Sequence, residues 1–155
     1  MYLVKLIALS LLCFLTSCNR SSSFNRDIWI ENPRMEDTHN PRARMVQDVM
    51  KRQLKAGMSR KSVLALLGKP YREGTEPRLP KNTILPDSFS VRTPEAFSRE
   101  NQKKRMDAFN NFVRLHAEQI MLMRYPVGWS TMDPRFLIIK LNNKGLVEDY
   151  WVEQG

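Results

Sequence analysis

Two apolar runs near the C-terminus are typical of β-strands. They cover residues 136–141 and 146–153, and the segment 142–145, Asn-Asn-Lys-Gly, separates them. A type I turn with Gly145 in the left-handed conformation fits a connection of this length. We therefore predict a β-hairpin here, preceded by a first strand over 120–127 and a connecting loop over 128–134.

The middle of the chain has a helical period instead. Apolar side chains recur between residues 46 and 54 on one face of a predicted helix. After a break at 56–58, Ser59 is a suitable N-cap for a second short helix, which Gly68 and Pro70 end. Two short helices so close in sequence should lie side by side as a hairpin. The predicted fold class is α+β, with this two-helix hairpin packed on a three-stranded antiparallel sheet.

The segment 72–117 is a predicted insertion between the second helix and the first strand. Its first part contains three prolines and is expected to be an irregular loop, and Thr93-Pro94-Glu95 is a typical helix start. The helix should run to about Ala117. Its apolar stripe is more typical of core or self-packing than of a partner groove, and the basic run 103–105 is either a solvated face or a contact for anionic headgroups. The stripe consists of Met106, Phe109, Phe112, Val113 and His116.

The N-terminus has the pattern of an export signal. An apolar run from Leu6 to Leu15 follows Lys5, and it has about half of the roughly 20 residues that a membrane-spanning helix needs. Residues 15–18, Leu-Thr-Ser-Cys, resemble the processing site of bacterial lipoproteins, which implies acylation of Cys18 and removal of residues 1–17. The alternative is an ordinary signal peptide that releases a soluble protein. Gram-negative lipoproteins with an aspartate directly after the acylated cysteine tend to be retained in the inner membrane. This chain has Asn19 at that position, so the resemblance implies sorting to the outer membrane.

Residues 18–43 are predicted to form a flexible tether between the anchor and a folded domain over 44–155. Serines and prolines dominate the tether, but it contains the apolar island Ile28-Trp29-Ile30. This island either docks on a partner, because tryptophan is common at binding hot spots, or packs back on its own domain.

Charge and chemistry then restrict the class of function. Without residues 1–17 the chain has 24 basic and 16 acidic residues, a formal charge of +8. Export argues against nucleic acid and favours anionic headgroups or acidic envelope proteins as partners. Both cysteines lie within residues 1–18, and neither His39 nor His116 has metal-ligand spacing. We therefore predict no catalytic residues, no metal site and no cofactor, and expect a protein that is not an enzyme.

Residues 57–70, from Gly57-Met58-Ser59 to Leu67-Gly68-Lys69-Pro70, resemble the helix motif of the BamE (small protein A) outer-membrane lipoprotein family. The C-terminal hairpin is similar to the last two strands of that family, so the resemblance covers about residues 45–71 and 118–153. Ser62 departs from the glutamate that commonly closes the capping box there.

The resemblance implies an interaction module at the periplasmic face of the outer membrane, accessory to outer-membrane protein assembly or envelope integrity. Its partners would be an envelope complex such as the β-barrel assembly machinery, and anionic phospholipid. Two alternatives remain open: a lipoprotein of a secretion or other envelope machine, and an inhibitor-type binding module. The candidate contact residues are Trp29, Arg60, Lys61, Tyr125 and Trp129. The alternatives are that Trp129 caps the sheet edge and that Arg60 and Lys61 are solvated first-turn residues, although their charges oppose the helix dipole and so need an explanation.

Overall fold

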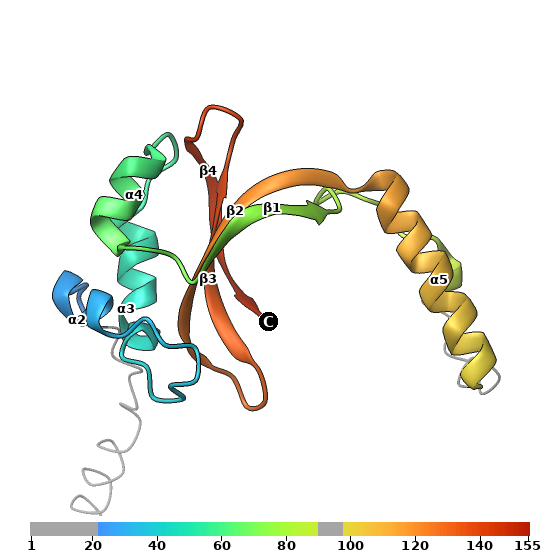
Figure 1. The fold of residues 1–155 in the computed structure, drawn as a ribbon, viewed down its shortest axis with the longest axis horizontal. Helices are drawn as coiled ribbons and strands as arrows, with labels where there is room; N and C mark the ends of the chain where they lie inside the picture. The colour runs from blue at the N-terminus through green and yellow to red at the C-terminus, as the bar shows by residue number, and fades with distance from the viewer. Residues whose placement is uncertain (1–21, 90–97) are drawn as a thin grey trace, which may run out of the picture.

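A four-stranded antiparallel sheet in the order β1-β2-β3-β4 is the centre of the molecule (Figure 1). The computed structural model describes residues 22–89 and 98–155, so the predicted signal sequence, Cys18 and the expected helix start at 93–95 lie outside the described residues. The strands are β1 (Arg72–Arg78), β2 (Glu118–Trp129), β3 (Pro134–Leu141) and β4 (Val147–Gln154). The α+β fold class is therefore confirmed, although the sheet has one strand more than predicted.

Three short α-helices and a π-helical turn cover one face of the sheet. They are α2 (Arg26–Glu31), α3 (Arg42–Asp48), the π-helix η2 (Val49–Gln53) and α4 (Arg60–Leu67). Their apolar side chains and those of β2 and β3 form one buried cluster, which is the main core. Burial of this shared apolar area is the dominant stabilising term. The largest members of the cluster are Trp29, Leu54, Leu67, Met123, Tyr125, Leu137 and Ile139.

The predicted β3–β4 hairpin and the second helix are confirmed in their local chemistry. Gly145 has φ +71°, and the Asn142 side-chain oxygen accepts hydrogen bonds from the N–H groups of Lys144 and Leu146. At the start of α4, Ser59 accepts a hydrogen bond from the N–H of Ser62, and the two hydroxyls lie 2.9 Å apart. Ser62 thus interacts with the capping residue in place of the family glutamate.

β1 is a correction to the sequence prediction, which made this segment an irregular loop. It pairs with β2 from Arg72↔Arg124 to Arg78↔Glu118. The strand escaped prediction because it has no apolar alternation and contains Pro77. Pro77 is tolerated because β1 is an edge strand, where a missing N–H need not break the sheet.

The helix layer also differs from the predicted hairpin. α4 makes more contacts with α2 than with α3. α3 packs on β2. The place beside α4 is taken by α2, which lies in the expected tether. Asn25 caps α2 by accepting a hydrogen bond from the N–H of Ile28, and Trp29 is fully buried. The packed part of the chain therefore begins well before residue 44, and the prediction of a flexible tether is wrong for α2 and the segment that follows it.

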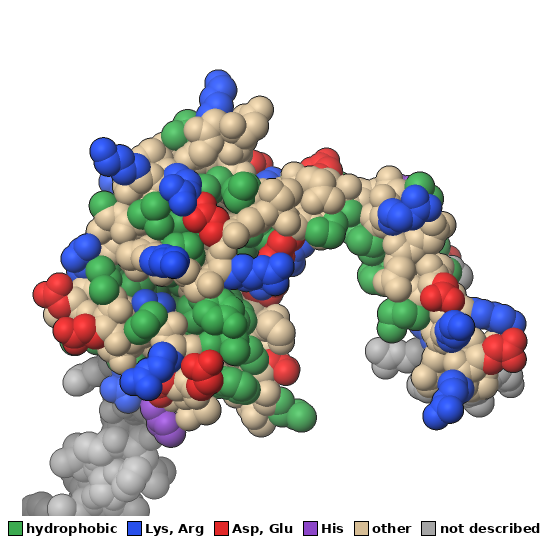
Figure 2. Space-filling model, viewed as in Figure 1, with side chains coloured by type: hydrophobic (Ala, Val, Ile, Leu, Met, Phe, Trp, Pro, Cys, Tyr) green, Lys and Arg blue, Asp and Glu red, His purple; other side chains and the backbone are tan. Residues whose placement is uncertain are grey.

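The inserted helix α5 (Arg99–His116) stands away from the body of the molecule, and none of its residues is buried (Figure 2). Its N-cap is Ser98, which accepts a hydrogen bond from the N–H of Asn101. The apolar stripe packs on the 3-10 helix η3 (Asp87–Phe89) and not on the core: the ring of Phe89 lies 5.6 Å from those of Phe109 and Phe112. No helix within residues 22–89 and 98–155 has both the length and the apolar character needed to cross a membrane.

Gly68 should be the most sensitive glycine of the helix layer. Its backbone has φ +74° and ψ −164°, a region that side-chain-bearing residues avoid, and an added Cβ would lie 3.4 Å from Ile30. We expect Gly68→Ala to lower the free energy of unfolding by about 1–3 kcal/mol in urea titrations. Gly74→Ala is the matched control, because a Cβ there meets nothing within 4 Å. An equal loss in both variants would contradict the backbone argument.

Candidate functional site

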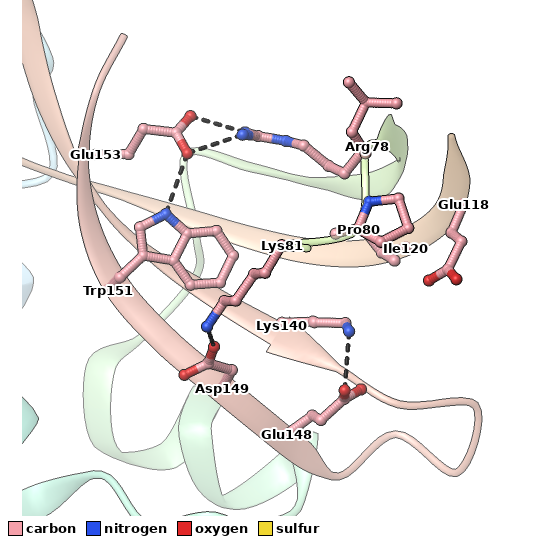
Figure 3. Close-up of a pocket in the computed structure, with 11 residues that line it drawn as sticks. Arg78, Pro80, Lys81, Glu118, Ile120, Lys140, Glu148, Asp149, Trp151 and Glu153 are labelled. Atoms are coloured by element: carbon pink, nitrogen blue, oxygen red, sulfur yellow. Dashed lines mark hydrogen bonds and ion pairs between the residues drawn. The ribbon is translucent and has the colours of Figure 1, made fainter. Parts of the chain in front are cut away.

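The face of the sheet opposite the helices carries a second, smaller apolar cluster. Leu122, Phe136 and Ile138 are buried there, although no helix of the described residues lies over them, and Met35, Ile120 and Trp151 pack against them. A hollow of about 540 Å³ opens over this face, where Leu79, Pro80 and Lys81 fold across the sheet after β1 (Figure 3). We call this the open face.

Ion pairs across three strands frame the open face. Arg124 of β2 donates two hydrogen bonds to Glu76 of β1, at 3.0 and 2.6 Å. Arg78 of β1 donates two to Glu153 of β4, at 2.9 and 2.7 Å. Arg124 also lies 3.6 Å from Glu153, which joins the two pairs into one network. Bidentate hydrogen bonding is the strongest geometry for a guanidinium–carboxylate pair.

These contacts lower the carboxylate pKa values. Hydrogen bonding from Arg124 lowers the pKa of Glu76 below its usual value of 4.5, against the opposing effect of burial. For Glu153, burial raises the pKa, but the hydrogen bonds from Arg78 and Trp151 outweigh it, and the pKa is lowered overall. Both groups are thus held as carboxylates at neutral pH.

The rim of the hollow has two further ion pairs. Lys81 contacts Asp149, and Lys140 lies 2.8 Å from Glu148. Trp151 lies between the Arg78–Glu153 and Lys81–Asp149 pairs, with its indole N–H donating to Glu153 at 3.1 Å (Figure 3). An apolar floor with an aromatic ring and a charged rim is suited to non-covalent docking of another surface. Within the described part of the chain, no group of three or more His, Cys, Asp or Glu side chains could hold a metal ion.

Trp29, a predicted contact residue, is fully buried and joins the N-terminal segment to the domain. The guanidinium of Arg42 lies over its ring at 4.8 Å, and Phe24 packs edge-on at 5.8 Å. Arg42 is itself 1% exposed and donates to the carbonyls of Trp29 at 2.7 Å and of Pro126 at 3.3 Å. Burial lowers the pKa of Arg42 to about 10, against a smaller raising effect of Tyr125. Of the two alternatives for the island, packing on its own domain is the one that the structure shows for Trp29 and Ile30, whereas Ile28 is exposed.

Tyr125 and Trp129 hold parts of the domain together. Tyr125 is fully buried and its hydroxyl donates to the carbonyl of Gly68 at 3.0 Å; burial raises its pKa. Trp129 is partly buried and donates to the carbonyl of Met35 at 2.7 Å. The burial of Trp29 and Tyr125 contradicts their prediction as contact residues, because a buried ring cannot meet a partner without unfolding its surroundings.

Arg60 has the partner that its position at a helix start requires. Its guanidinium donates to Glu73 of β1 at 2.5 and 2.9 Å, and this hydrogen bond lowers the pKa of the Glu73 carboxyl. Lys61 is exposed beside it. The pair joins α4 to β1, so Arg60 has a structural role and Lys61 remains accessible.

The open face was not predicted from the sequence, because it depends on β1, which was not predicted either. One signal was present: Glu76 and Arg78 are separated by one residue, so in a strand they share a face. Glu148 and Asp149 are consecutive and would face opposite sides in a regular strand, but both line the hollow, since the register shifts by one residue between Lys140 and Leu141.

Loss of Arg42 should destabilise the domain. We expect Arg42→Ala to lower the free energy of unfolding by about 2–4 kcal/mol, because it leaves two buried carbonyls without a donor and a cavity beside Trp29. Arg42→Lys should lose less, since it keeps one donor group. Urea unfolding measures the effect, and the exposed Arg44→Ala variant is the control. A loss no larger than that of the control would show that the buried cation is dispensable.

The carboxylate network should make stability depend on pH in the acid range. A lowered folded pKa contributes stability that is complete above the unfolded value near 4.5 and is lost as the pH falls through the folded value. Unfolding free energies measured from pH 7 to pH 3 should therefore decrease, and Glu76→Gln should reduce that dependence while costing about 1–3 kcal/mol at pH 7. The exposed Glu31→Gln variant should leave the profile unchanged.

No family model, curated protein or solved structure matches this chain. The resemblance to BamE proteins therefore remains a prediction from the motif residues. The geometry of the open face, together with the N-terminal sequence, supports the proposals that follow.

Proposed function

We propose that this protein is a lipoprotein at the periplasmic face of the outer membrane and that its domain is a non-enzymatic binding module. Acyl chains on Cys18 would hold it there. The observation that supports a binding role is the one-sided cover of the sheet: helices pack on one face, while the open face presents Trp151 and Ile120 in a charged frame. Such an apolar surface with a polar rim is typical of an interaction site.

The anchor is supported by the sequence of residues 15–18. Attachment through two or three acyl chains would be stable, at about 0.8 kcal/mol for each buried methylene. The chain from residue 19 to the start of the packed part near Phe24 is short and would keep the domain close to the membrane. A domain placed in this way can reach envelope proteins and headgroups but not cytoplasmic partners.

The proposed role is accessory to the assembly of outer-membrane proteins or to envelope integrity. The motif at residues 57–70 supports this role through its resemblance to BamE proteins, and β-barrel assembly proteins and anionic phospholipid are the corresponding partners. Of the contact residues predicted from the sequence, Lys61 is exposed and Trp129 is partly exposed. The open face replaces Trp29 and Tyr125 as the main candidate surface.

A second candidate function is a lipoprotein of another envelope machine, such as a secretion apparatus. The specific observation that favours it is α5, which extends from the body and is absent from a compact two-helix, three-strand form. An inhibitor-type module is the third candidate, because the open face could cover a surface of another protein. The identity of the bound partner distinguishes the three.

Replacement of Cys18 should abolish acylation and membrane attachment. We expect the wild-type chain to incorporate labelled palmitate and to fractionate with the outer membrane, and Cys18→Ala to do neither. Cys13→Ala is the matched control and should behave as wild type. A wild-type protein found soluble in the periplasm would contradict the anchor.

Partner capture then tests the accessory role. Crosslinking in living cells followed by mass spectrometry should recover β-barrel assembly proteins with the wild-type chain and fewer of them with Cys18→Ala. Recovery of a secretion complex or of a single periplasmic enzyme would support the second or third candidate function in place of the first.

A further inference from the structure

We propose that the arm of one copy of this protein docks on the open face of a second copy, and that the contact is reciprocal. We define the arm as Ile84, Leu85, η3 and α5. The inference goes beyond the proposed function and is independent of the lipid anchor. It follows from two apolar surfaces that the described residues 22–89 and 98–155 leave uncovered and that cannot reach each other within one chain.

The arm exposes large apolar side chains on one face. Met106 is 60% exposed, Leu85 46%, Phe109 36% and Ile84 90%. η3 covers only part of this face, and a hollow of about 560 Å³ remains between η3 and α5. Exposed apolar area of this kind on a long helix favours a protein partner. The hollow is lined by Leu85, Phe89, Gln102, Arg105, Met106 and Phe109.

Contacts between η3 and α5 hold the arm in one conformation, so its exposed apolar face is part of the folded structure. Phe89 packs edge-on against Phe109 and Phe112, and Arg105 donates to the carbonyl of Phe89 at 2.8 Å. His116 stacks on Phe112 with ring centres 4.2 Å apart. A helix held in this way presents its apolar side chains at little additional entropic cost on binding.

The arm cannot cover the open face of its own chain. β1 and β2 stay paired as far as Arg78↔Glu118, and α5 ends at His116, two residues before Glu118. The paired strands therefore hold the base of α5 at the far end of the sheet. α5 contacts chiefly β1 and η3, and open space separates it from the body (Figure 2). The arm of a second molecule can reach that space, and a two-fold axis would let each copy fill it for the other.

Charge favours this pairing of surfaces. α5 has five basic and two acidic residues, a net charge of +3. The residues that line the open-face hollow include three basic and four acidic side chains, a net charge of −1. The three cations are paired with Glu153, Asp149 and Glu148, so Glu118 is the acidic side chain without an ion pair among the described residues. A basic arm thus meets an acidic rim that has one carboxylate to spare.

Site-specific photo-crosslinking in the full-length chain tests the proposal. Two differently tagged copies are produced in the same cells, and one of them carries a photoreactive amino acid in place of Met106. We expect an adduct between the two tags whose crosslinked peptides contain residues that line the hollow of the other copy, in the ranges 78–81, 118–120 and 140–153. The same amino acid in place of Asn111, on the polar side of α5, is the control and should give about tenfold less of that adduct.

Paired variants distinguish arm-to-face docking from other dimers. Phe109→Glu places a carboxylate on the arm, and Ile120→Lys places a cation on the open face, so each should reduce the adduct about tenfold when both copies carry it. Mixing a Phe109→Glu copy with an Ile120→Lys copy should restore the adduct in one direction, from the intact arm of the latter to the intact face of the former.

Unfolding midpoints in urea should show that both variants are folded, and the uncharged change Asn111→Ala on the polar side of α5 is a third variant that should leave the adduct unchanged. Adducts that join arm to arm, that stay within one chain, or that contain lipid or another protein in place of the second copy would overturn the proposal. The absence of any adduct between the two tags would overturn it as well.

Discussion

Backbone pairing along β2 sets the positions of β1, β3 and the base of α5. β2 pairs with β1 on one side, from Arg124 to Glu118, and with β3 on the other, from Met121 to Trp129. Its 12 residues span roughly 40 Å, more than the helix layer can cover. The end near Trp129 therefore lies in the core, while the end at Glu118 extends beyond it and carries α5. A body and a separate arm follow directly from this one long strand.

The helix layer depends on a different interaction, the burial of Arg42 against Trp29. A buried guanidinium is costly unless its N–H groups have acceptors, and here it donates to carbonyls of α2 and β2 while lying over an indole ring. These contacts join the N-terminal segment, α3 and the sheet. They also explain how a six-residue helix, far too short to be stable alone, holds a fixed place.

Sequence reasoning succeeded where the apolar period was strong. β3 and β4, which the Asn142–Gly145 turn joins, and the helix capped by Ser59 each have a local sequence pattern that is sufficient to predict the element. It failed where a segment is stabilised by distant partners: β1 is polar and is held by pairing with β2, and α2 needs Arg42.

The site residues were likewise predicted only where a local pattern was sufficient. Arg60 was identified from its unfavourable place at a helix start, but its partner Glu73 lies on the strand that was missed. Trp29 and Tyr125 were wrong as contacts, because a large aromatic residue suits both a core and an interface, and composition alone cannot separate the two. The open face required β1 and β4 to be placed on either side of β2 and β3, which no local pattern provides.

The antiparallel pairing of β1 and β2 makes everything between Arg78 and Glu118 a hairpin connection, however long it is. The entropic cost of closing such a connection grows only with the logarithm of its length, at about 0.6 kcal/mol for each doubling. The sheet and its core would thus remain nearly as stable if the arm were lengthened, rewritten or cut back to a tight turn. Evolution can therefore change what this domain recognises at the arm while leaving the fold that carries it untouched.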